Sequence, residues 1–576
     1  MGSLDAVAET LLRRRYLRQD EDGEVVETPD EMFRRVAANL ARAEAAFGGD
    51  VGATERRFYE TMRELEFLPN SPTLMNAGTE LQQLAACFVL PIGDSLESIF
   101  TAVKRTALIH QSGGGTGFSF SKLRPAGDVV KETGGVASGP VSFMKVFDAA
   151  TEQIKQGGRR RGANMAVLDA SHPDIEAFVT VKSEADTLRN FNLSVATDAA
   201  FWAAHGAGEP YDLVNPRTGE VVRRGSPDGL LDLIAEMAWE TGDPGLLFLD
   251  TINEANPTPE LGRIEATNPC GEVPELPYEA CVLGSVDLGK HTDGRSVDWE
   301  ALGETVRLGV RLLDDAIEMS TFPVPEIAEA VARTRKVGLG VMGFHDVLVD
   351  LRVPYDSEEA VDLAREVMAF VDEEAWAASR RLAEERGPFP AWEDSVHEEP
   401  VRNATTTTVA PTGSISLIAG CSASIEPIYG VAYTKQVLGG LEVVNDRFVE
   451  MAKERGFYSA DLVERLHDRT TIRDVEEIPE DVRRLFRTAH DVPADQHLRI
   501  QAAFQEHVDN AVSKTVNLPR SATVEDVKEV FLTAREYDLK GVTVFRSGAR
   551  PEQVLGESPL KEECARECDY VSPRER

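Results

Sequence analysis

From about Leu65 onward the sequence alternates short apolar runs with longer amphipathic stretches, and this alternation constrains the fold most strongly. Four of the runs have the composition of buried strands: residues 87–90, 118–120, 246–249 and 282–286. Short apolar runs separated by helical patterns are typical of parallel strands joined by crossover helices. We therefore predict an α/β fold with largely parallel strands over residues 65–555.

The first 64 residues predict a helical region instead. Thr28-Pro29-Asp30-Glu31 has the pattern of a capping box with proline at the first helical position. Apolar residues then recur at helical spacing until Gly48-Gly49: Met32, Phe33, Val36, Leu40 and Phe47. The interval 387–400, rich in proline and acidic residues, indicates a surface connection, and the charged residues 556–576 indicate a flexible tail.

The formal net charge of −37 limits the possible partners. Non-specific nucleic-acid binding needs lysines and arginines that neutralise phosphates, so this charge argues against a nucleic-acid partner. The acidic residues are spread along the chain and arginine outnumbers lysine. This distribution favours adaptation to a salt-rich cytoplasm, where screening removes self-repulsion. The alternative is a very soluble acidic enzyme without such adaptation.

The sequence also predicts a cytoplasmic protein. It contains no apolar run long enough to span a membrane, and its first residues lack the basic and apolar regions of an export signal. Six cysteines in 576 residues do not form a disulfide-rich secreted scaffold. In a reducing compartment such thiols are more often catalytic or metal-binding.

Asn268-Pro269-Cys270-Gly271-Glu272 is the strongest functional motif, because it places a thiol between an amide and a carboxylate on a predicted tight turn. Cys281 follows shortly after, and Cys87 lies far upstream. The set supplies one reactive sulfur with a general base and two sulfurs suited to a dithiol reductant. The alternative for the Cys-Gly-Glu triplet is a small buried hydrophobe, the usual role of an unoxidised cysteine.

Two glycine-rich motifs resemble nucleotide-binding loops without meeting their requirements. Gly338 to Gly343 satisfies G-x-G-x-x-G, but the preceding residues 329–336 are charged and helix-like rather than an apolar strand. We expect these glycines to let a strand pack closely against the following helix. Gly113 to Gly117 lacks the Lys-Ser/Thr of a P-loop, although it can bring backbone close to a ligand.

Residues 410–416, Ala-Pro-Thr-Gly-Ser-Ile-Ser, are a better candidate for binding phosphate. These residues could begin a helix, and the hydroxyls and backbone N–H groups at a helix N-terminus form a natural anion site. The alternative is an ordinary helix cap. For Asn70-Ser71-Pro72-Thr73 the alternative to a binding role is a surface turn.

Together these segments resemble the catalytic chain of ribonucleotide reductases, specifically the adenosylcobalamin-dependent (class II) type. The resemblance runs from residue 66 to residue 548 and rests on five motifs in the family's order: 70–78, 113–118, 268–272, 338–343 and 411–416. It implies a ten-stranded α/β barrel of two five-stranded parallel halves, with the reactive cysteine on a loop inside. The implied activity is reduction of ribonucleotides, with diphosphates the expected substrates, to 2′-deoxyribonucleotides for DNA synthesis.

The resemblance also implies a role for each residue of the cysteine set. Cys270 would carry a thiyl radical that removes the 3′-hydrogen of the ribose. Glu272 would accept the 3′-hydroxyl proton, and Asn268 would orient the ribose. Cys87 and Cys281 would protonate the departing 2′-hydroxyl, supply two electrons and end as a disulfide.

Binding residues follow from the same resemblance. Those expected to line the substrate are Ser71 or Thr73, Ala86, Gly115, Pro269, Gly271, Pro411, Thr412, Gly413, Ser414 and Ile415. Asp94, Lys122 and Arg124 resemble the part that binds a deoxynucleotide or ATP as specificity effector. Residues 157–162 resemble the loop that relays it, and a homodimer is an expected assembly.

The expected cofactor is adenosylcobalamin. Class I chains receive their radical through adjacent tyrosines, but residues 539–546 (Leu-Lys-Gly-Val-Thr-Val-Phe-Arg) contain none, and no class III glycyl-radical motif is present near the end. The nearer alternative is a class I-type large subunit with a separate radical-generating subunit. The remote one is a catalytically silent nucleotide-binding regulator, against which the complete cysteine set argues.

The last segment contains Cys564-Ala565-Arg566-Glu567-Cys568. We interpret Cys564 and Cys568 as a redox shuttle that exchanges thiols with a thioredoxin-like reductant. A half zinc site lacks further ligands, so no residue is assigned to a metal. The remaining alternative is a tail without function.

Overall fold

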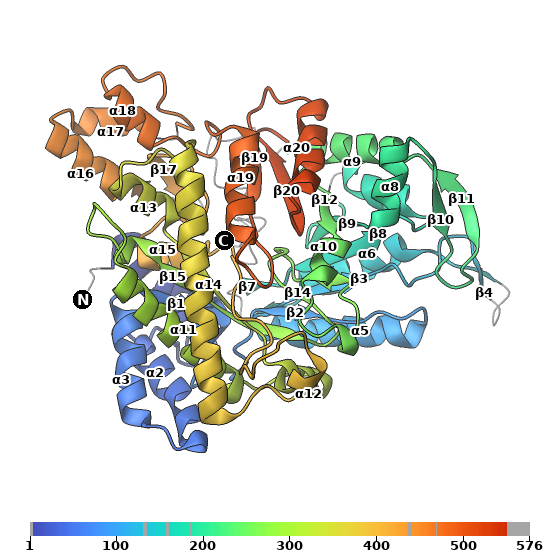
Figure 1. Ribbon diagram of the computed structural model, residues 1–576, viewed down its shortest axis with the longest axis horizontal. Helices are drawn as coiled ribbons and strands as arrows, with labels where there is room; N and C mark the ends of the chain where they lie inside the picture. Colours follow the sequence, from blue (N-terminus) through green and yellow to red (C-terminus); the bar gives the residue numbers. More distant parts are fainter. Residues whose placement is uncertain are drawn as a thin grey trace.

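The computed structural model describes residues 4–130, 135–156, 160–184, 186–435, 441–467 and 469–549. Figure 1 shows a group of N-terminal helices at one side of a strand barrel, which is surrounded by further helices. Among the described residues, no helix has both the length and the apolar character needed to cross a bilayer.

Helices and short helical turns form the N-terminal region: α1 (Ala6–Leu11), η1 (Leu12–Tyr16), α2 (Pro29–Ala41), η2 (Arg42–Phe47) and α3 (Val51–Arg63). The predicted capping box is present. Glu31 N donates to Thr28 Oγ1 at 3.3 Å, and Thr28 N donates to Glu31 Oε2 at 2.8 Å. The run ends at Gly48, whose φ of 73° is left-handed. The prediction of an N-terminal helical region is confirmed.

Five parallel strands form the first half of the barrel: β2 (Cys87–Val89), β3 (Gly115–Ser119), β8 (Asn164–Asp169), β9 (Phe191–Thr197) and β12 (Gly245–Phe248). Three of the four predicted apolar runs overlap β2, β3 and β12, each ending one residue after the strand. These strands are buried along nearly their whole length, which is why they appear in the sequence as apolar runs without alternation.

The second half is formed by β15 (Ala280–Asp287), β16 (Val337–Met342), residues 405–409, β19 (Thr515–Leu518) and β20 (Gly541–Arg546). Residues 405–409 join β16, where Leu339 N donates to Thr406 O at 2.8 Å. On their other side Ser513 N donates to Val409 O at 2.8 Å, next to β19.

The two halves meet in antiparallel pairs, β15 with β2 and β20 with β12, and this closes the sheet. The expected ten-stranded barrel of two five-stranded parallel halves is thereby confirmed. A short additional strand, β1 (Phe67–Pro69), pairs antiparallel with β15.

The glycines of residues 338–343 lie in β16 and directly after it. A Cβ placed on Gly340 would lie 2.1 Å from Thr408 O, so this glycine lets residues 405–409 approach β16. The prediction that the close partner is the following helix, α13 (Phe344–Asp350), was therefore wrong for this glycine. The sequence could not reveal the true partner, because Thr408 lies far along the chain.

Helices cover the outside of the barrel: α5 (Leu96–Gln111), α9 (Pro227–Thr241), α11 (Trp299–Met319), α14 (Glu358–Arg386), α19 (Ala494–Gln505) and α20 (Val524–Glu536). Helix α11 packs on β15 and β16 and also contacts α2 and α14, so it joins the N-terminal region to the barrel. Apolar side chains between these helices and the strands form the largest core.

A smaller helical lobe has its own apolar core: α16 (Asp446–Arg455), α17 (Ala460–Leu466) and α18 (Glu480–Leu485). Figure 1 shows it at the upper left, away from α2 and α3. The predicted surface connection, 387–400, contains only one short helical turn, Trp392–Asp394, and is largely exposed or half-buried.

Candidate active site

The Cys270 motif forms a hairpin loop between β13 (Ala266–Thr267) and β14 (Pro274–Glu275). Asn268 closes it, because its Oδ1 accepts from Val273 N at 3.0 Å and its backbone carbonyl accepts from Gly271 N at 3.1 Å. Gly271 has a φ of 83°, a conformation that favours glycine. The predicted tight turn is therefore present.

The hairpin lies inside the barrel and contacts both of its halves. On the second half, Ala511 N and Thr408 Oγ1 donate to Glu272 O at 2.9 and 2.8 Å. On the first half, a Cβ on Gly117 of β3 would lie 1.7 Å from Thr267 O. The glycine run 113–117 thus brings backbone close to the hairpin. Gly117 affects the active site indirectly, because its lack of a side chain allows the hairpin to lie against β3.

Three of the predicted side chains form a direct polar cluster. Asn268 Nδ2 donates to Cys87 Sγ at 3.0 Å and to Glu272 Oε2 at 2.7 Å, while Cys87 Sγ lies 3.9 Å from Glu272 Oε1. All three side chains are buried, whereas Cys270 is half-buried. The cluster places an amide, a thiol and a carboxyl group around one point beside the Cys270 turn.

Burial sets the protonation of this cluster. Removal from water raises the pKa of Glu272 to about 7, although its hydrogen bond from Asn268 acts in the opposite direction. A carboxyl group with this pKa can accept and return a proton near neutral pH. Its environment therefore suits the role of general base.

Cys281 lies directly opposite Cys87 in the antiparallel pair of β15 and β2. Side chains opposite each other in such a pair have Cβ atoms about 4.5–5.5 Å apart. A disulfide needs about 3.5–4.5 Å, so a small adjustment would bring the two sulfurs within bonding distance.

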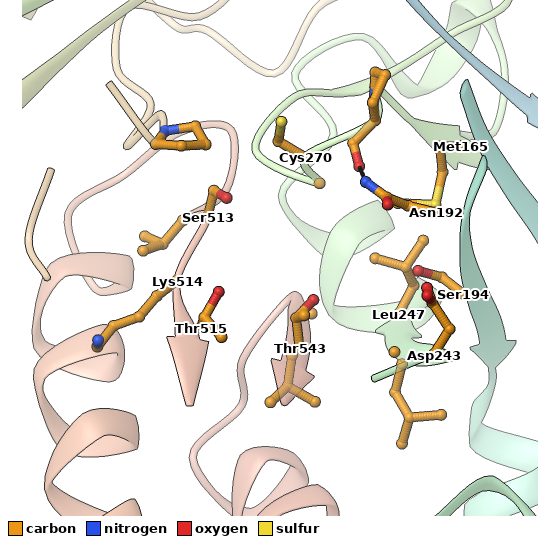
Figure 2. A pocket seen from close by; sticks show the side chains of 18 of the residues that line it. Met165, Asn192, Ser194, Asp243, Leu247, Cys270, Ser513, Lys514, Thr515 and Thr543 are labelled. Atoms are coloured by element: carbon orange, nitrogen blue, oxygen red, sulfur yellow. Dashed lines mark hydrogen bonds between the residues drawn. The ribbon is translucent and has the colours of Figure 1, made fainter. Parts of the chain in front are cut away.

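Cys270 borders a cavity of about 110 Å³ between the hairpin and strands β9, β12, β19 and β20. Figure 2 shows the side chains around it, with Cys270 on one side and Thr515 and Thr543 on another. Asn192 of β9 joins this wall to the hairpin, because its Nδ2 donates to Pro269 O at 2.7 Å. Pro269, Gly271 and Pro411 are the predicted substrate residues that line this cavity.

Other predicted substrate residues lie nearby in the strands or in a buried helix start. Gly115 N donates to Ala86 O at 2.8 Å, and Gly115 is opposite Cys87. Ser71 and Thr73 begin the buried helix α4 (Ser71–Asn76), so the alternative of a surface turn at this motif was wrong. The Thr73 hydroxyl donates to Asn70 Oδ1 at 2.7 Å as part of the helix cap.

The predicted phosphate segment does open a helix, α15 (Ile415–Ala419), directly after Ser414. Thr412 has a φ of 54°, and its hydroxyl accepts from Ser424 N at 2.7 Å. Gly413 borders a second cavity of about 150 Å³, whereas Pro411 borders the cavity of Cys270. The segment therefore lies between the two cavities.

The predicted effector residues form two ion pairs. Arg124 Nε donates to Asp94 Oδ2 at 2.7 Å, and Lys122 Nζ lies 2.7 Å from Glu265 Oε2. Of the predicted relay loop, residues 157–159 lie outside the described residues, as do Cys564 and Cys568 of the tail.

The sequence analysis missed a buried group of charged side chains beside the cysteines: Glu275, Glu279 and Lys336. Lys336 Nζ lies 2.6 Å from Glu279 Oε2, and both are buried. One available signal was the pair of acidic residues, Glu275 and Glu279, that flank the apolar residues 276–278.

The geometry and the matches to known families define the class of this protein. A family model described as the ribonucleotide reductase barrel domain matches residues 85–400 and 393–545. A second, described as the ribonucleotide reductase all-alpha domain, matches residues 3–82. The chain belongs to the ribonucleotide reductase family.

Within the family, its relatives include proteins named vitamin B12-dependent ribonucleoside-diphosphate reductase. The one from Mycobacterium tuberculosis (strain CDC 1551 / Oshkosh) is 52% identical over 566 residues, covering 97% of this chain and 81% of the relative. The one from Thermoplasma acidophilum is 46% identical over 623 residues, covering 96% and 81%.

A solved structure has the same fold. The class Id ribonucleotide reductase alpha subunit of Actinobacillus ureae aligns with a TM-score of 0.80 at 23% identity, covering 95% of this chain and 97% of that one. At this identity the likeness shows the fold alone.

Proposed function

We propose that this chain reduces ribonucleoside diphosphates to 2′-deoxyribonucleoside diphosphates, with adenosylcobalamin as cofactor, and so supplies precursors for DNA synthesis. The observation that carries the proposal is the cluster of Cys87, Asn268 and Glu272 at the Cys270 hairpin, with Cys281 opposite Cys87. The names of the relatives at 52% and 46% identity support the same substrate class and cofactor.

In the proposed reaction, Cys270 as a thiyl radical removes the 3′-hydrogen atom of the ribose. Glu272 accepts the 3′-hydroxyl proton, for which its pKa of about 7 is suited. Asn268 orients the ribose hydroxyls toward the Glu272 carboxyl and the Cys87 thiol, because its amide contacts both groups.

Cys87 and Cys281 supply two electrons and two protons for the reduction. One proton leaves with the 2′-hydroxyl as water, and the other hydrogen remains on the 2′-carbon. The two sulfurs join, so a ribonucleotide and a dithiol become a deoxyribonucleotide, water and a disulfide. Their opposite positions in β2 and β15 support this pairing.

The residues beside Cys270 fit the adenosyl part of the cofactor. Small or hydroxyl-bearing residues line the cavity and leave room next to the thiol: Ser194, Gly245, Thr515, Gly541 and Thr543. When bound, adenosylcobalamin supplies a radical by homolysis of its cobalt–carbon bond. The half-buried Cys270 borders the cavity that these residues form, which suits local generation of its radical.

The class I-type alternative is less well supported. Thr543 of β20 lines the cavity that Cys270 borders, and residues 539–546 contain no tyrosine for a radical relay. A catalytically silent regulator is disfavoured by the complete set of cysteine, amide and carboxyl groups.

The remaining assignments are proposals on the same basis. Residues 411–415 hold the diphosphate, with Ser71 or Thr73, Ala86 and Gly115 near the ribose. Asp94, Lys122 and Arg124 belong to an effector site for a deoxynucleotide or ATP. The chain acts in the cytoplasm as a homodimer, and a thioredoxin-like protein reduces it through Cys564 and Cys568.

One assay tests the central proposal. Nucleoside diphosphate reduction is measured with dithiothreitol in high salt, with and without adenosylcobalamin, for the wild type and Cys270→Ser. We expect turnover only in the wild type with the cofactor, and near-normal nucleotide binding in the variant. Activity restored by a metal-containing radical subunit without cobalamin would overturn the cofactor assignment, and turnover by Cys270→Ser would overturn the mechanism.

A further inference from the structure

The N-terminal helical region reaches both segments that the proposed function assigns to the substrate. Helix α1 packs on α15, the helix that follows the proposed diphosphate segment. Asp5 and Val7 line the same cavity of about 150 Å³ as Gly413 and Ser416. The turn η1 packs on α4, the helix that begins at Ser71. A region that supplies no reacting group therefore borders both parts of the proposed substrate site.

Tyr16 connects this region to α4. It ends η1, a π-helical turn that continues directly from α1, and its side chain is buried. A π-helical turn takes in one residue more than an α-helical turn, which shifts the side chains that follow by about 100° around the helix axis. Such turns are rare and are frequently found at functional sites. Here the Tyr16 hydroxyl lies 2.8 Å from Oγ of Ser71, 55 residues further along the chain.

Hydrogen bonds distinguish Ser71 from Thr73, the two hydroxyls that are alternatives in the proposed function. Thr73 Oγ1 donates within the protein, with Asn70 Oδ1 at 2.7 Å and Leu84 O at 3.0 Å as acceptors, and Thr73 is 0% exposed. Since a hydroxyl has one hydrogen, that of Thr73 is already engaged. Ser71 is 8% exposed, and within the described part of the chain its hydroxyl bonds only to Tyr16. Ser71 is therefore the hydroxyl left for the substrate.

Ser71 also lies beside the cysteine pair. Asn70, the residue before it, donates its backbone N–H to Leu283 O at 2.8 Å. The Leu283 side chain packs with Cys87 and Cys281 in one apolar cluster. The start of α4 thus lies against the strand that carries Cys281, where the proposed reaction places the ribose.

The direction of the hydrogen bond between Tyr16 and Ser71 follows from the acidity of the two hydroxyls. A phenol is more acidic than an aliphatic alcohol and is therefore the better donor. Tyr16 donates to Ser71 Oγ, and Ser71 keeps its own hydrogen for another acceptor. A phosphate oxygen without a proton fits this requirement, because it only accepts hydrogen bonds. A ribose hydroxyl, in contrast, both donates and accepts.

We propose that Tyr16 is a positioning residue for the substrate: it donates to Ser71 Oγ and directs the Ser71 hydrogen at an oxygen of the α-phosphate. The inference rests on the proposed function, because that function places the ribose, and with it the 5′-phosphate, beside Ser71. Through Tyr16, the N-terminal helical region takes part in binding the substrate.

The test is a double-mutant cycle in the full-length chain, with Tyr16→Phe, Ser71→Ala and the double variant. Tyr16→Phe removes one hydroxyl and keeps the ring in the core. Tyr458→Phe is the matched control, because it makes the same change at a side chain that is 42% exposed. The KM and kcat of cobalamin-dependent diphosphate reduction are measured with dithiothreitol, together with the Ki of inorganic pyrophosphate as a competitor.

We expect Ser71→Ala to raise KM and Ki about 10-fold, as for one lost hydrogen bond to a charged group. Tyr16→Phe should raise both about fivefold, as for one neutral hydrogen bond. Its kcat should stay within about twofold of the wild type, because the contact is made equally in the ground state and the transition state. In the Ser71→Ala background, Tyr16→Phe should have no further effect, since the two residues act through one contact. The control should match the wild type.

A wild-type KM in either single variant would overturn the inference. Equal effects of Tyr16→Phe with and without Ser71 would contradict it as well, because they would indicate a structural role. A raised KM with an unchanged Ki for pyrophosphate would refute the assignment to phosphate. Absence of diphosphate reduction by the wild type would instead overturn the proposed function, and this inference with it.

Discussion

Replacing Gly117 with alanine should separate the Cys270 hairpin, which carries Asn268, from the strands of the first barrel half, which include Cys87. Gly117 lies in β3, opposite Val89 of the strand that carries Cys87. The added Cβ would lie 1.7 Å from Thr267 O and 2.7 Å from Thr267 C, both backbone atoms of the Cys270 hairpin. Because backbone atoms cannot rotate away as a side chain can, either the hairpin or the strand must move.

The size of this movement follows from the structure. Ordinary contact begins at 3.4 Å, so the overlap is relieved by a displacement of about 1.7 Å, the difference between the two distances. Asn268 and Cys87 are only 3.0 Å apart across the same gap, and their contact would be lost. A misplacement of about 1 Å at reacting groups can lower kcat about 10²-fold. We expect a loss of at least that size.

The assay is cobalamin-dependent diphosphate reduction with dithiothreitol, together with nucleotide binding and thermal unfolding. Overpacking should reduce the free energy of unfolding by about 1–3 kcal/mol, which leaves the barrel folded. Gly206→Ala in α8 (Ala199–Ala207) is the control, because a Cβ there meets nothing within 4 Å. A kcat for Gly117→Ala within about threefold of the wild type would refute the reasoning.

Three further predictions concern protonation, stability and re-reduction. Because a general base must be deprotonated, wild-type kcat should rise as the pH passes about 7. Glu272→Gln should abolish this rise and lower kcat about 10²–10⁴-fold. A pH profile of kcat that is unchanged in the variant would exclude Glu272 as the base. Lys336→Met leaves Glu279 buried without its cation, so urea unfolding should show a loss of about 3–5 kcal/mol at neutral pH, and a loss below about 1 kcal/mol would contradict it. The double variant Cys564→Ser/Cys568→Ser should keep its activity with dithiothreitol and lose multiple turnovers with thioredoxin; equal losses with both reductants would indicate a structural role, and no loss with either an idle tail.

The buried carboxyl group of Glu275 gives the stability of the chain a pH dependence. Its pKa is raised in the folded chain, so its contribution is present in full below the pKa of an unfolded glutamate. This contribution to the free energy of unfolding is lost as the pH rises through the pKa that Glu275 has in the folded chain. As the pH rises, the free energy of unfolding should therefore fall less in Glu275→Gln than in the wild type. Parallel curves of this free energy against pH would mean that Glu275 is already ionised in the folded chain.

The sequence by itself determined the local features. The capping box at Thr28 and the turn at Asn268–Glu272 depend on neighbouring residues, so short patterns predict them well. The apolar runs identified several barrel strands, because a strand buried on both faces needs apolar residues throughout. The complete barrel came from resemblance to a family, since residues 405–409 do not form an apolar run.

Only the tertiary structure decided which groups meet and how they ionise. Cys87 and Asn268 are 181 residues apart, and no local pattern specifies their 3.0 Å contact. The pKa of Glu272 depends on its burial and on the contacts of its carboxyl group with Asn268 and Cys87. Likewise, the unpartnered carboxyl of Glu275 exists only once the barrel has closed around it. Backbone preference is a property of neighbours in the chain, whereas desolvation and contact arise from distant segments that fold together.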